Sequence, residues 1–363
     1  MDRGISWRPG LERIAPYQPG KPIEEVEREL GISNAVKLAS NENPLGPSPR
    51  VREALRRAAG AVHRYPDGAC FGLRAALSRR LGVKPGELLL GNGSNELLVL
   101  LGQAYLRPGD EVLTSRQTFV VYEMVALLAN AKLVAVPLRN YAYDLDALRR
   151  AVTPRTRLIF IANPNNPTGT AVEPRELRAF VDRVPGRCLV VLDEAYFEYM
   201  DPAFQADTLS WVRKRSNLVV LRTFSKAYAL AGLRVGYGVA HASVAQAIER
   251  VREPFNVNHL AQAGAVAALA DPAHMRRAVS LAKRERKRVS RALADLGCEV
   301  APSQANFVFA RVPRGDGRAC YGRVLRLGVI LRPMPGPYVR ITLGTKAEND
   351  KMLSAMKAVV AVL

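Results

Sequence analysis

The sequence has few of the residues that build metal sites and disulfide frameworks. Its 363 residues include only four cysteines and four histidines. No two cysteines have CxxC spacing, and no two histidines have HxxxH spacing. The pattern therefore predicts neither a zinc site nor a disulfide framework, and we expect no metal and reduced thiols.

Long hydrophobic runs are also missing. No stretch approaches the roughly 18 consecutive apolar residues that a membrane-spanning helix needs. The first 22 residues are charged and rich in proline, and they lack the apolar core of a signal peptide. We therefore expect no membrane contact and a cytoplasmic location.

Acidic residues are in short supply, with 33 Asp and Glu against 53 Lys and Arg, a net charge of +20. The densest basic run, residues 276–291, holds eight Lys or Arg and one Glu. Such a run can bind nucleic acid, or it can be a solvated helix face whose field attracts anionic substrates and phosphate-bearing cofactors. No recognition helix, RNP motif or basic zipper accompanies it, so we favour the second interpretation and expect no nucleic-acid partner.

From residue 88 onward, short apolar runs alternate with helical patterns. This alternation of strands and helices predicts an α/β fold with a mainly parallel central sheet sandwiched by helices. Beyond about residue 258 the pattern changes to long helices and short strands, which indicates a smaller α+β domain. We divide the chain into an arm with a short helix (1–45), a large domain (46–257) and a small domain (258–363). The expected strands of the large domain are 88–91, 111–114, 132–137, 157–162, 188–193, 218–223 and 235–240.

Three of these strands run directly into polar motifs. Strand 157–162 is followed by NPNNPTG (163–169), strand 188–193 ends in Asp193 with Tyr196 nearby, and strand 218–223 leads to Ser225 and Lys226. The carboxyl ends of parallel strands share one edge of a sheet, so these groups are expected to lie together. A fourth strand enters GNGSNE (91–96), a tight turn into a helix whose free amides suit a phosphate.

Each motif alone has an ordinary interpretation. The lysine could lie at the surface, Asp193 could cap a helix, and NPNNPTG could be a simple turn. GNGSNE does not match the dinucleotide GxGxxG, the hydrolase GxSxG or a P-loop. The combination, however, is what pyridoxal 5′-phosphate needs: a lysine for a Schiff base, an acid for the ring nitrogen, donors for the phenolate oxygen and a phosphate pocket.

The motifs also carry a family resemblance. SNENPLGPSP, RYPDG, GNGSNE, NPNNPTG, DEAY, TFSKAYALAGLRVGYG and VRITLGT resemble the fold-type I aminotransferases, and PYQPGKPIEEVERELG resembles the histidinol-phosphate aminotransferase family in particular. The resemblance extends from about residue 16 to the C-terminus. It implies the fold-type I fold, pyridoxal phosphate as cofactor, and a homodimer with shared active sites.

The resemblance also implies roles for individual residues. Lys226 would form the Schiff base and move the proton, Asp193 would bind the pyridine nitrogen, and Phe119 would stack on the ring. The phenolate donors would be Asn166 and Tyr196. The cofactor phosphate would be held by Gly93, Ser94, Asn95, Ser225 and Arg234, with Tyr65 from the neighbouring subunit.

Four residues would bind the substrate by the same resemblance. Arg340 would grip an anion, and Arg332, Tyr17 and Asn43 would lie at the substrate. The chain departs from the family between the two arginines, where RPMPGPYVR is shorter than the usual loop.

The implied reaction is amino transfer between L-histidinol phosphate and 2-oxoglutarate, in histidine biosynthesis, by a ping-pong cycle. An aromatic amino acid aminotransferase and a phosphothreonine decarboxylase are alternatives on the same fold. A DNA-binding regulator with this fold is a third alternative. Such regulators carry a winged-helix domain before the fold, and we disfavour this alternative because only about 15 residues precede the resemblance.

Overall fold

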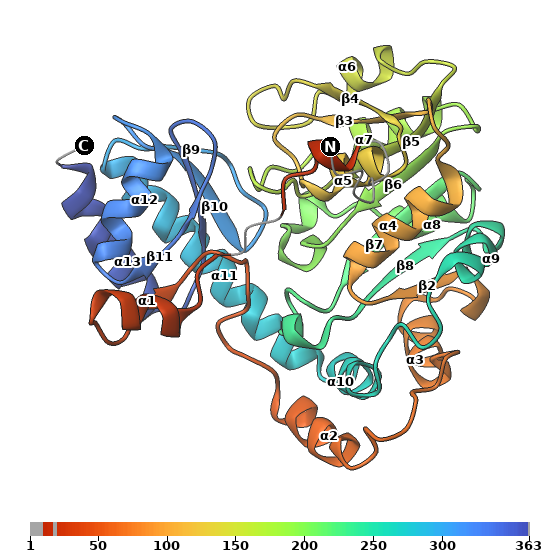
Figure 1. The fold of residues 1–363 in the computed structure, drawn as a ribbon, viewed down its shortest axis with the longest axis horizontal. Helices are drawn as coiled ribbons and strands as arrows, with labels where there is room; N and C mark the ends of the chain where they lie inside the picture. The colour runs from red at the N-terminus through yellow and green to blue at the C-terminus, as the bar shows by residue number, and fades with distance from the viewer. Residues whose placement is uncertain (1–9, 17–19, 362–363) are drawn as a thin grey trace, which may run out of the picture.

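A seven-stranded sheet forms the centre of the large domain in the computed structural model, which describes residues 10–16 and 20–361 (Figure 1). β8 runs antiparallel to both its neighbours, and the other neighbouring strands are parallel. In spatial order the strands are β2 (Leu88–Gly91), β8 (Gly236–Ala240), β7 (Leu218–Thr223), β6 (Leu189–Asp193), β5 (Thr156–Ala162), β3 (Glu111–Ser115) and β4 (Lys132–Val136).

The inner strands are buried along their length, β6 and β7 at every residue. Successive side chains of a strand point to opposite faces, so this burial requires cover on both faces. α4 lies along β2, β7 and β8, and α5 lies along β3 and β4, while α8 packs beside β7. The predicted α/β fold is confirmed, and each predicted strand is present to within about one residue.

The helices of the large domain are α2 (Pro49–Ala59), α3 (Phe71–Leu81), α4 (Ser94–Tyr105), α5 (Val121–Leu128), α6 (Leu145–Arg150), α7 (Pro174–Arg183), α8 (Thr208–Val212), α9 (Ala242–Val251) and α10 (His259–Leu269).

Local signals set the helix ends. Ser48 accepts a hydrogen bond from the Val51 amide, Pro49 occupies the first position of α2, and Gly60 follows its end. The Ala-rich segment after Lys226 forms a turn and a short 3-10 helix, Ala231–Leu233, with no α-helix before β8.

The small domain is built on a second, antiparallel sheet in the order β12-β13-β10-β9. The N-terminal arm joins this domain, because β1 pairs in parallel with β11 and Val26 packs against Ile330. The elements of the arm and the small domain are α1 (Ile23–Leu30), β1 (Val36–Lys37), α11 (Pro272–Asp295), β9 (Glu299–Val300), β10 (Phe307–Arg311), α12 (Gly317–Arg326), β11 (Val329–Ile330), β12 (Arg332–Pro333), β13 (Tyr338–Thr342) and α13 (Lys346–Val360).

The two hydrophobic cores meet along α11, the long helix that connects the domains (Figure 1). α10 packs against α2 and α3, and its Ala261 and Ala265 belong to the core of the large domain. Further along the chain, Val289 and Leu293 of α11 belong to the core of the small domain. The division between the cores therefore falls within α11, later in the chain than our predicted boundary at residue 258.

No helix in residues 10–16 and 20–361 is both long enough and apolar enough to cross a membrane. The cytoplasmic location stays a prediction.

Candidate active site

The three predicted motifs meet at one edge of the large sheet. β5, β6 and β7 are parallel neighbours, with Ala162 beside Asp193 and Asp193 beside Leu221. Their carboxyl ends open into a cavity of about 560 Å³, a size typical of small-molecule sites. The predicted residues that line it are Gly93, Ser94, Asn95, Phe119, Asn166, Asp193, Tyr196, Ser225, Lys226, Arg234 and Arg340.

Lys226 presents its amine to this cavity. Its Nζ donates a hydrogen bond to the Ser40 carbonyl at 3.1 Å and lies 5.8 Å from the centre of the Tyr196 ring. Burial, together with the nearby positive charges of Arg340 and Arg234, lowers the pKa of Lys226 to about 8, while Glu42 and Asp193 oppose this shift. A substantial fraction of this amine is therefore neutral, and nucleophilic, near physiological pH.

Asp193 occupies the last position of β6 and is 6% exposed. Its Oδ2 accepts a hydrogen bond from the Tyr122 hydroxyl at 2.9 Å, and its Oδ1 accepts one from the Ala195 amide at 3.2 Å. Burial raises the pKa of Asp193, while these two bonds and the charge of Lys226 oppose the rise. The carboxylate is thus aimed into the cavity from a strand end that fixes its backbone.

The start of α4 forms a cradle with room for an anion. Gly93 precedes the helix with φ +77°, a conformation that favours glycine. A Cβ atom at Gly93 would lie 2.7 Å from Nη2 of Arg234, and one at Gly236 would lie 2.2 Å from the Ser94 amide nitrogen. The glycines let the guanidinium and the helix amides approach each other, and both groups favour a phosphate.

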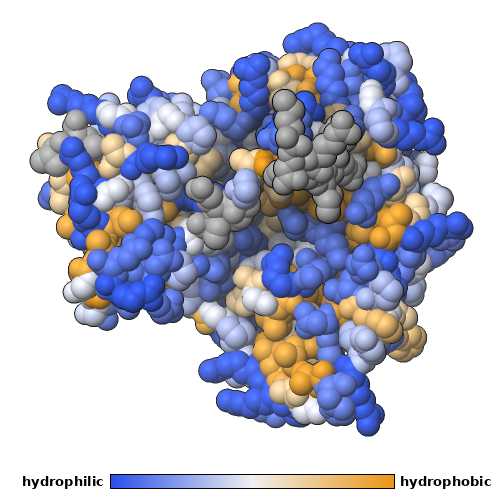
Figure 2. Space-filling view, in the orientation of Figure 1, coloured by the Kyte–Doolittle hydropathy of each residue, from blue (hydrophilic) through white to orange (hydrophobic). Residues whose placement is uncertain are grey.

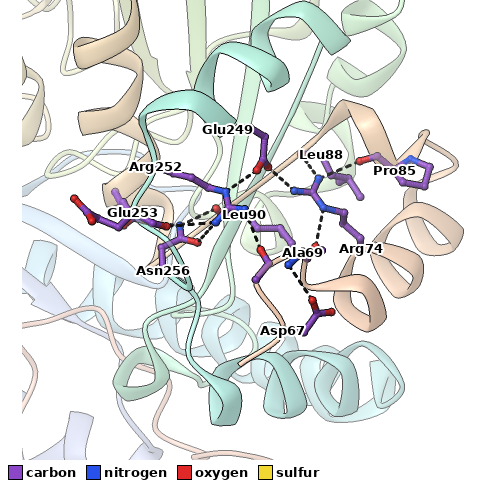
Figure 3. A network of polar contacts seen from close by, with 12 residues as sticks. Asp67, Ala69, Arg74, Pro85, Leu88, Leu90, Glu249, Arg252, Glu253 and Asn256 are labelled. Carbon is purple, nitrogen blue, oxygen red and sulfur yellow. Dashed lines mark hydrogen bonds and ion pairs between the residues drawn. The ribbon is translucent and has the colours of Figure 1, made fainter. Parts of the chain in front are cut away.

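A polar network ties this cradle to the segment that follows Tyr65 (Figure 3). Arg252 donates to the Gly68 carbonyl at 3.0 Å and to Glu249 at 2.6 Å, and Arg74 contacts the same glutamate at 2.6 Å. Next in the network, Asn256 donates to Glu96 in the first turn of α4 at 2.6 Å. The loop after Tyr65 is therefore held in a fixed relation to the cradle.

Arg340 forms the opposite part of the lining, contributed by β13 of the small domain. It is 9% exposed, and it donates to Oδ1 of Asn166 and to the Ala39 carbonyl, each at 2.6 Å. A surface charge, the ordinary interpretation of an arginine at a strand end, is thereby excluded for this residue. A buried guanidinium at a cavity wall is suited to binding an anion.

The shortened RPMPGPYVR segment closes as a tight hairpin between β12 and β13. The Met334 amide donates to the Tyr338 carbonyl at 2.9 Å, and Gly336 has φ +73°. Arg332 is the direct cross-strand partner of Arg340. Directly opposed residues share a face of the sheet, so the hairpin puts two arginines side by side.

Three other predicted residues of the described chain lie outside the cavity lining. Arg332 is half-buried and does not line the cavity, and Asn43 donates to the Ala227 carbonyl at 3.0 Å, supporting the backbone just after Lys226. Tyr65 is 83% exposed and stacks on Phe255 with ring centres 4.8 Å apart. Tyr17 is outside the described residues.

Sequence reasoning missed several residues around the site. Tyr122 comes three residues after Phe119, at the start of α5; in a helical pattern this spacing puts two side chains on one face, a signal that could have identified Tyr122. Asn41 donates to the Tyr196 hydroxyl at 2.9 Å and accepts from Thr342 at 3.0 Å, linking β13 to the cavity. No sequence pattern pairs residues 301 positions apart, so this link could not have been predicted.

Comparison with known proteins agrees with this geometry. The family model for aminotransferase class I and II matches residues 33–356. The chain belongs to the class I and II aminotransferase family. A histidinol-phosphate aminotransferase of Anaeromyxobacter sp. (strain Fw109-5) is 51% identical over 354 residues, 96% of this chain and 97% of the relative. One from Moorella thermoacetica is 45% identical over 98% of this chain and 93% of its own length.

A solved structure of this aminotransferase family extends the comparison. Histidinol-phosphate aminotransferase from Sinorhizobium meliloti in complex with pyridoxal-5′-phosphate superposes with a TM-score of 0.91, at 31% identity, covering 99% of this chain and 98% of that one. The protein is accordingly an aminotransferase of fold type I that depends on pyridoxal phosphate, as the sequence predicts.

The residues present fit pyridoxal phosphate. Among the described residues, the cavity is lined by Arg234, Arg340 and Lys226 and by the acids Asp193 and Glu42, so that the two arginines offer positive charge to an anionic ligand. The two glycines at the cradle leave space that a Cβ would fill. When bound, the cofactor draws electrons away from the carbon that carries the amino group, so that a proton on this carbon can be removed.

Proposed function

We propose that this aminotransferase moves the amino group of L-histidinol phosphate to 2-oxoglutarate, with Lys226 as the residue that attaches to the cofactor aldehyde. The observation that carries the proposal is the amine of Lys226, with a pKa lowered to about 8, in a cavity that also presents Asp193 and Arg340. The relatives named above, both histidinol-phosphate aminotransferases, support the choice of substrate.

Lys226 has two tasks in this proposal. Its neutral amine holds the cofactor covalently, and after the substrate has displaced it, the same Nζ removes the proton from the substrate Cα. Burial and the two arginines favour the neutral base that both tasks need.

Each of the other residues around the cofactor then binds one particular part of it. Asp193 pairs with the ring nitrogen, Phe119 stacks on the ring, and Asn166 and Tyr196 donate to the phenolate oxygen. The cofactor phosphate lies in the cradle of Gly93, Ser94, Asn95, Ser225 and Arg234. The contact of Arg234 with Ser225, 3.5 Å between Nη1 and Oγ, supports this grouping.

The substrate phosphate lies at Arg340. Arg332 lies directly opposite Arg340 on the neighbouring strand, so a dianionic ligand at Arg340 lies in the field of both positive charges. For this reason we retain Arg332 as a second contact of the substrate phosphate, while Asn43 holds the backbone next to Lys226. Tyr17 stays a prediction from the sequence.

We also propose a homodimer in which Tyr65 reaches the cofactor phosphate of the partner. Large apolar side chains are exposed on and around α2, α3 and α10, among them Tyr65 at 83% and Phe71 at 77%. Figure 2 shows a hydrophobic patch at the lower end of the molecule, where Figure 1 places α2 and α10. Exposed patches of this kind mark protein interfaces. Sedimentation at several concentrations tests the dimer, and a purely monomeric holoenzyme would contradict it.

A panel of amino donors tests the substrate assignment. Purified holoenzyme is given L-histidinol phosphate, L-phenylalanine or L-phosphothreonine with 2-oxoglutarate, and glutamate and carbon dioxide are measured. We expect glutamate with the highest kcat/KM for histidinol phosphate. Preference for phenylalanine would replace the proposal by an aromatic aminotransferase, and release of carbon dioxide from phosphothreonine would replace it by a lyase.

A further inference from the structure

Tyr122 of α5 lies beside Asp193 at the wall of the cavity. Its side chain is fully buried, and its hydroxyl lies 2.9 Å from Oδ2 of the carboxylate. The ring stacks on Phe160 with centres 4.7 Å apart and planes 9° apart, and it meets Phe119 edge-on at 5.8 Å. Packing on two sides therefore fixes the direction in which the hydroxyl points.

The proton of this hydrogen bond belongs to the tyrosine. Burial and the charge of Asp193 raise the pKa of Tyr122 well above its usual range, so the phenol stays protonated and donates. A hydrogen bond donated to a carboxylate favours the charged form of the carboxylate. Tyr122 thus opposes the rise in the pKa of Asp193 that burial causes.

Few other groups near Asp193 favour its ionised form. The charge of Lys226 at the end of β7 and the amide of Ala195 also favour ionised Asp193. Tyr143 interacts with Asp193 only through space, and its own hydroxyl bonds to Thr118 at 2.7 Å. The neighbouring acid Glu194 is neutralised by Arg222 at 2.8 Å. Tyr196, the remaining tyrosine at this wall, receives its bond from Asn41 at 2.9 Å.

We propose that Tyr122 is a positioning residue that keeps Asp193 ionised and aimed at the ring nitrogen of the cofactor, and that it thereby sets the lower pH limit for cofactor binding. The inference rests on the proposed role of Asp193. In this inference Tyr122 acts through that carboxylate.

The test uses apoenzyme and pyridoxamine 5′-phosphate as the probe. This form of the cofactor has the same ring nitrogen and phosphate but cannot attach to Lys226, and its fluorescence reports binding. Dissociation constants are measured from mildly acidic to mildly alkaline pH for wild type, Tyr122→Phe, Tyr143→Phe and Asp193→Asn. Tyr143→Phe is the matched control, because it also removes one buried hydroxyl from the same region.

We expect Tyr122→Phe to bind the probe about tenfold more weakly at mildly acidic pH, the loss typical of one hydrogen bond to a charged group. Without the donated bond the pKa of Asp193 rises, so the pH below which affinity falls moves upward. In Tyr143→Phe we expect affinity for the probe to fall below the same pH as in wild type. In the Asp193→Asn background, adding Tyr122→Phe causes no further loss.

The outcomes separate the two claims. If Asp193→Asn weakens binding but Tyr122→Phe leaves the pH limit unchanged, the inference about Tyr122 is overturned while the role of Asp193 stands. If Asp193→Asn binds as tightly as wild type, the proposed role of Asp193 fails. Should Tyr122→Phe not fold, as judged by circular dichroism, site-specific 3-fluorotyrosine at 122 replaces it. This more acidic phenol strengthens the bond, so the limit must move downward, and an unchanged limit would overturn the inference.

Discussion

Nη1 of Arg340 lies 2.6 Å from Oδ1 of Asn166, so the small domain and the turn after β5 meet at the wall of the cavity. The two residues were assigned separately, one to the substrate anion and one to the cofactor phenolate. Because Oδ1 accepts the bond from Arg340, Asn166 presents its Nδ2 as the atom that can donate to a ligand. The arginine proposed to bind the substrate anion therefore also fixes the orientation of the amide proposed to bind the cofactor.

Replacing Lys226 with alanine tests the covalent role. We expect Lys226→Ala to bind pyridoxal phosphate only non-covalently and to lose turnover, because no other lysine lines the cavity among the described residues. Borohydride reduction followed by intact mass measurement detects the covalent adduct. Lys84→Ala, a change at an exposed lysine, is the control and should keep the adduct. Retained turnover in Lys226→Ala would falsify the assignment.

The pH dependence of cofactor attachment follows from the pKa of Lys226. In wild type, the rate of attachment to apoenzyme, trapped by reduction without substrate, should rise with pH through about 8. Arg340 lowers this pKa, so Arg340→Met should raise it and shift the rise to higher pH. Arg340→Lys keeps a positive charge and should shift the profile less. Identical profiles for all three proteins would exclude the electrostatic coupling.

A methyl group at Gly93 tests the phosphate cradle. Gly93→Ala requires a strained φ of +77° and puts Cβ 2.7 Å from Arg234, so the guanidinium must move. Loss of one charge-assisted contact weakens cofactor affinity by about tenfold or more. Gly186→Ala, at an exposed turn with open space around the glycine, should leave affinity unchanged. Equal affinity in both variants would mean that the phosphate lies elsewhere.

Arg222 and Glu194 form a buried ion pair at 2.8 Å behind the site, with the guanidinium 3.7 Å from the centre of the Phe197 ring. Arg222→Met leaves Glu194 buried without its partner and should lower the free energy of unfolding by about 3–5 kcal/mol. Arg149→Met removes an exposed pair and should lower it by less than about 1 kcal/mol. Urea denaturation of the two apoproteins measures the difference.

The decrease in the free energy of unfolding caused by Arg222→Met should also depend on pH. Burial raises the pKa of Glu198 to about 7 and also raises that of Glu194, while Arg222 opposes both shifts. Without Arg222 the folded-state pKa values rise further above the unfolded values. A raised carboxyl pKa makes the folded state lose stability as pH increases, so the deficit should be larger at alkaline pH than at about pH 5. A deficit that is constant with pH would contradict this electrostatic explanation.

Much of the site could be predicted because it depends on strand ends. Apolar runs identified β5, β6 and β7, and their parallel direction implied that Asn166, Asp193 and Lys226 share an edge. The cavity lining confirms that they lie together. These residues are adjacent to strongly patterned segments, which is where sequence reasoning is most reliable.

The remaining features depend on how separate elements pack. The insertion of β8 between β2 and β7, antiparallel to both, follows from no local pattern, and neither does the placement of α10 in the large core. Asn43 belongs to the same SNENPLGPSP motif as cavity-lining residues, yet its side chain turns to the backbone after Lys226. The direction of a single side chain within a loop is set by its neighbours in three dimensions, and these are not visible in the sequence.

The most direct test of the central claim is a single half-reaction. L-histidinol phosphate is added without an amino acceptor to the purified holoenzyme, and the visible absorption of the bound cofactor is recorded. We predict that the yellow absorption band disappears and is replaced by that of bound pyridoxamine phosphate. An unchanged band, in a preparation whose cofactor is shown to be attached to Lys226, would contradict the assignment of histidinol phosphate as the substrate.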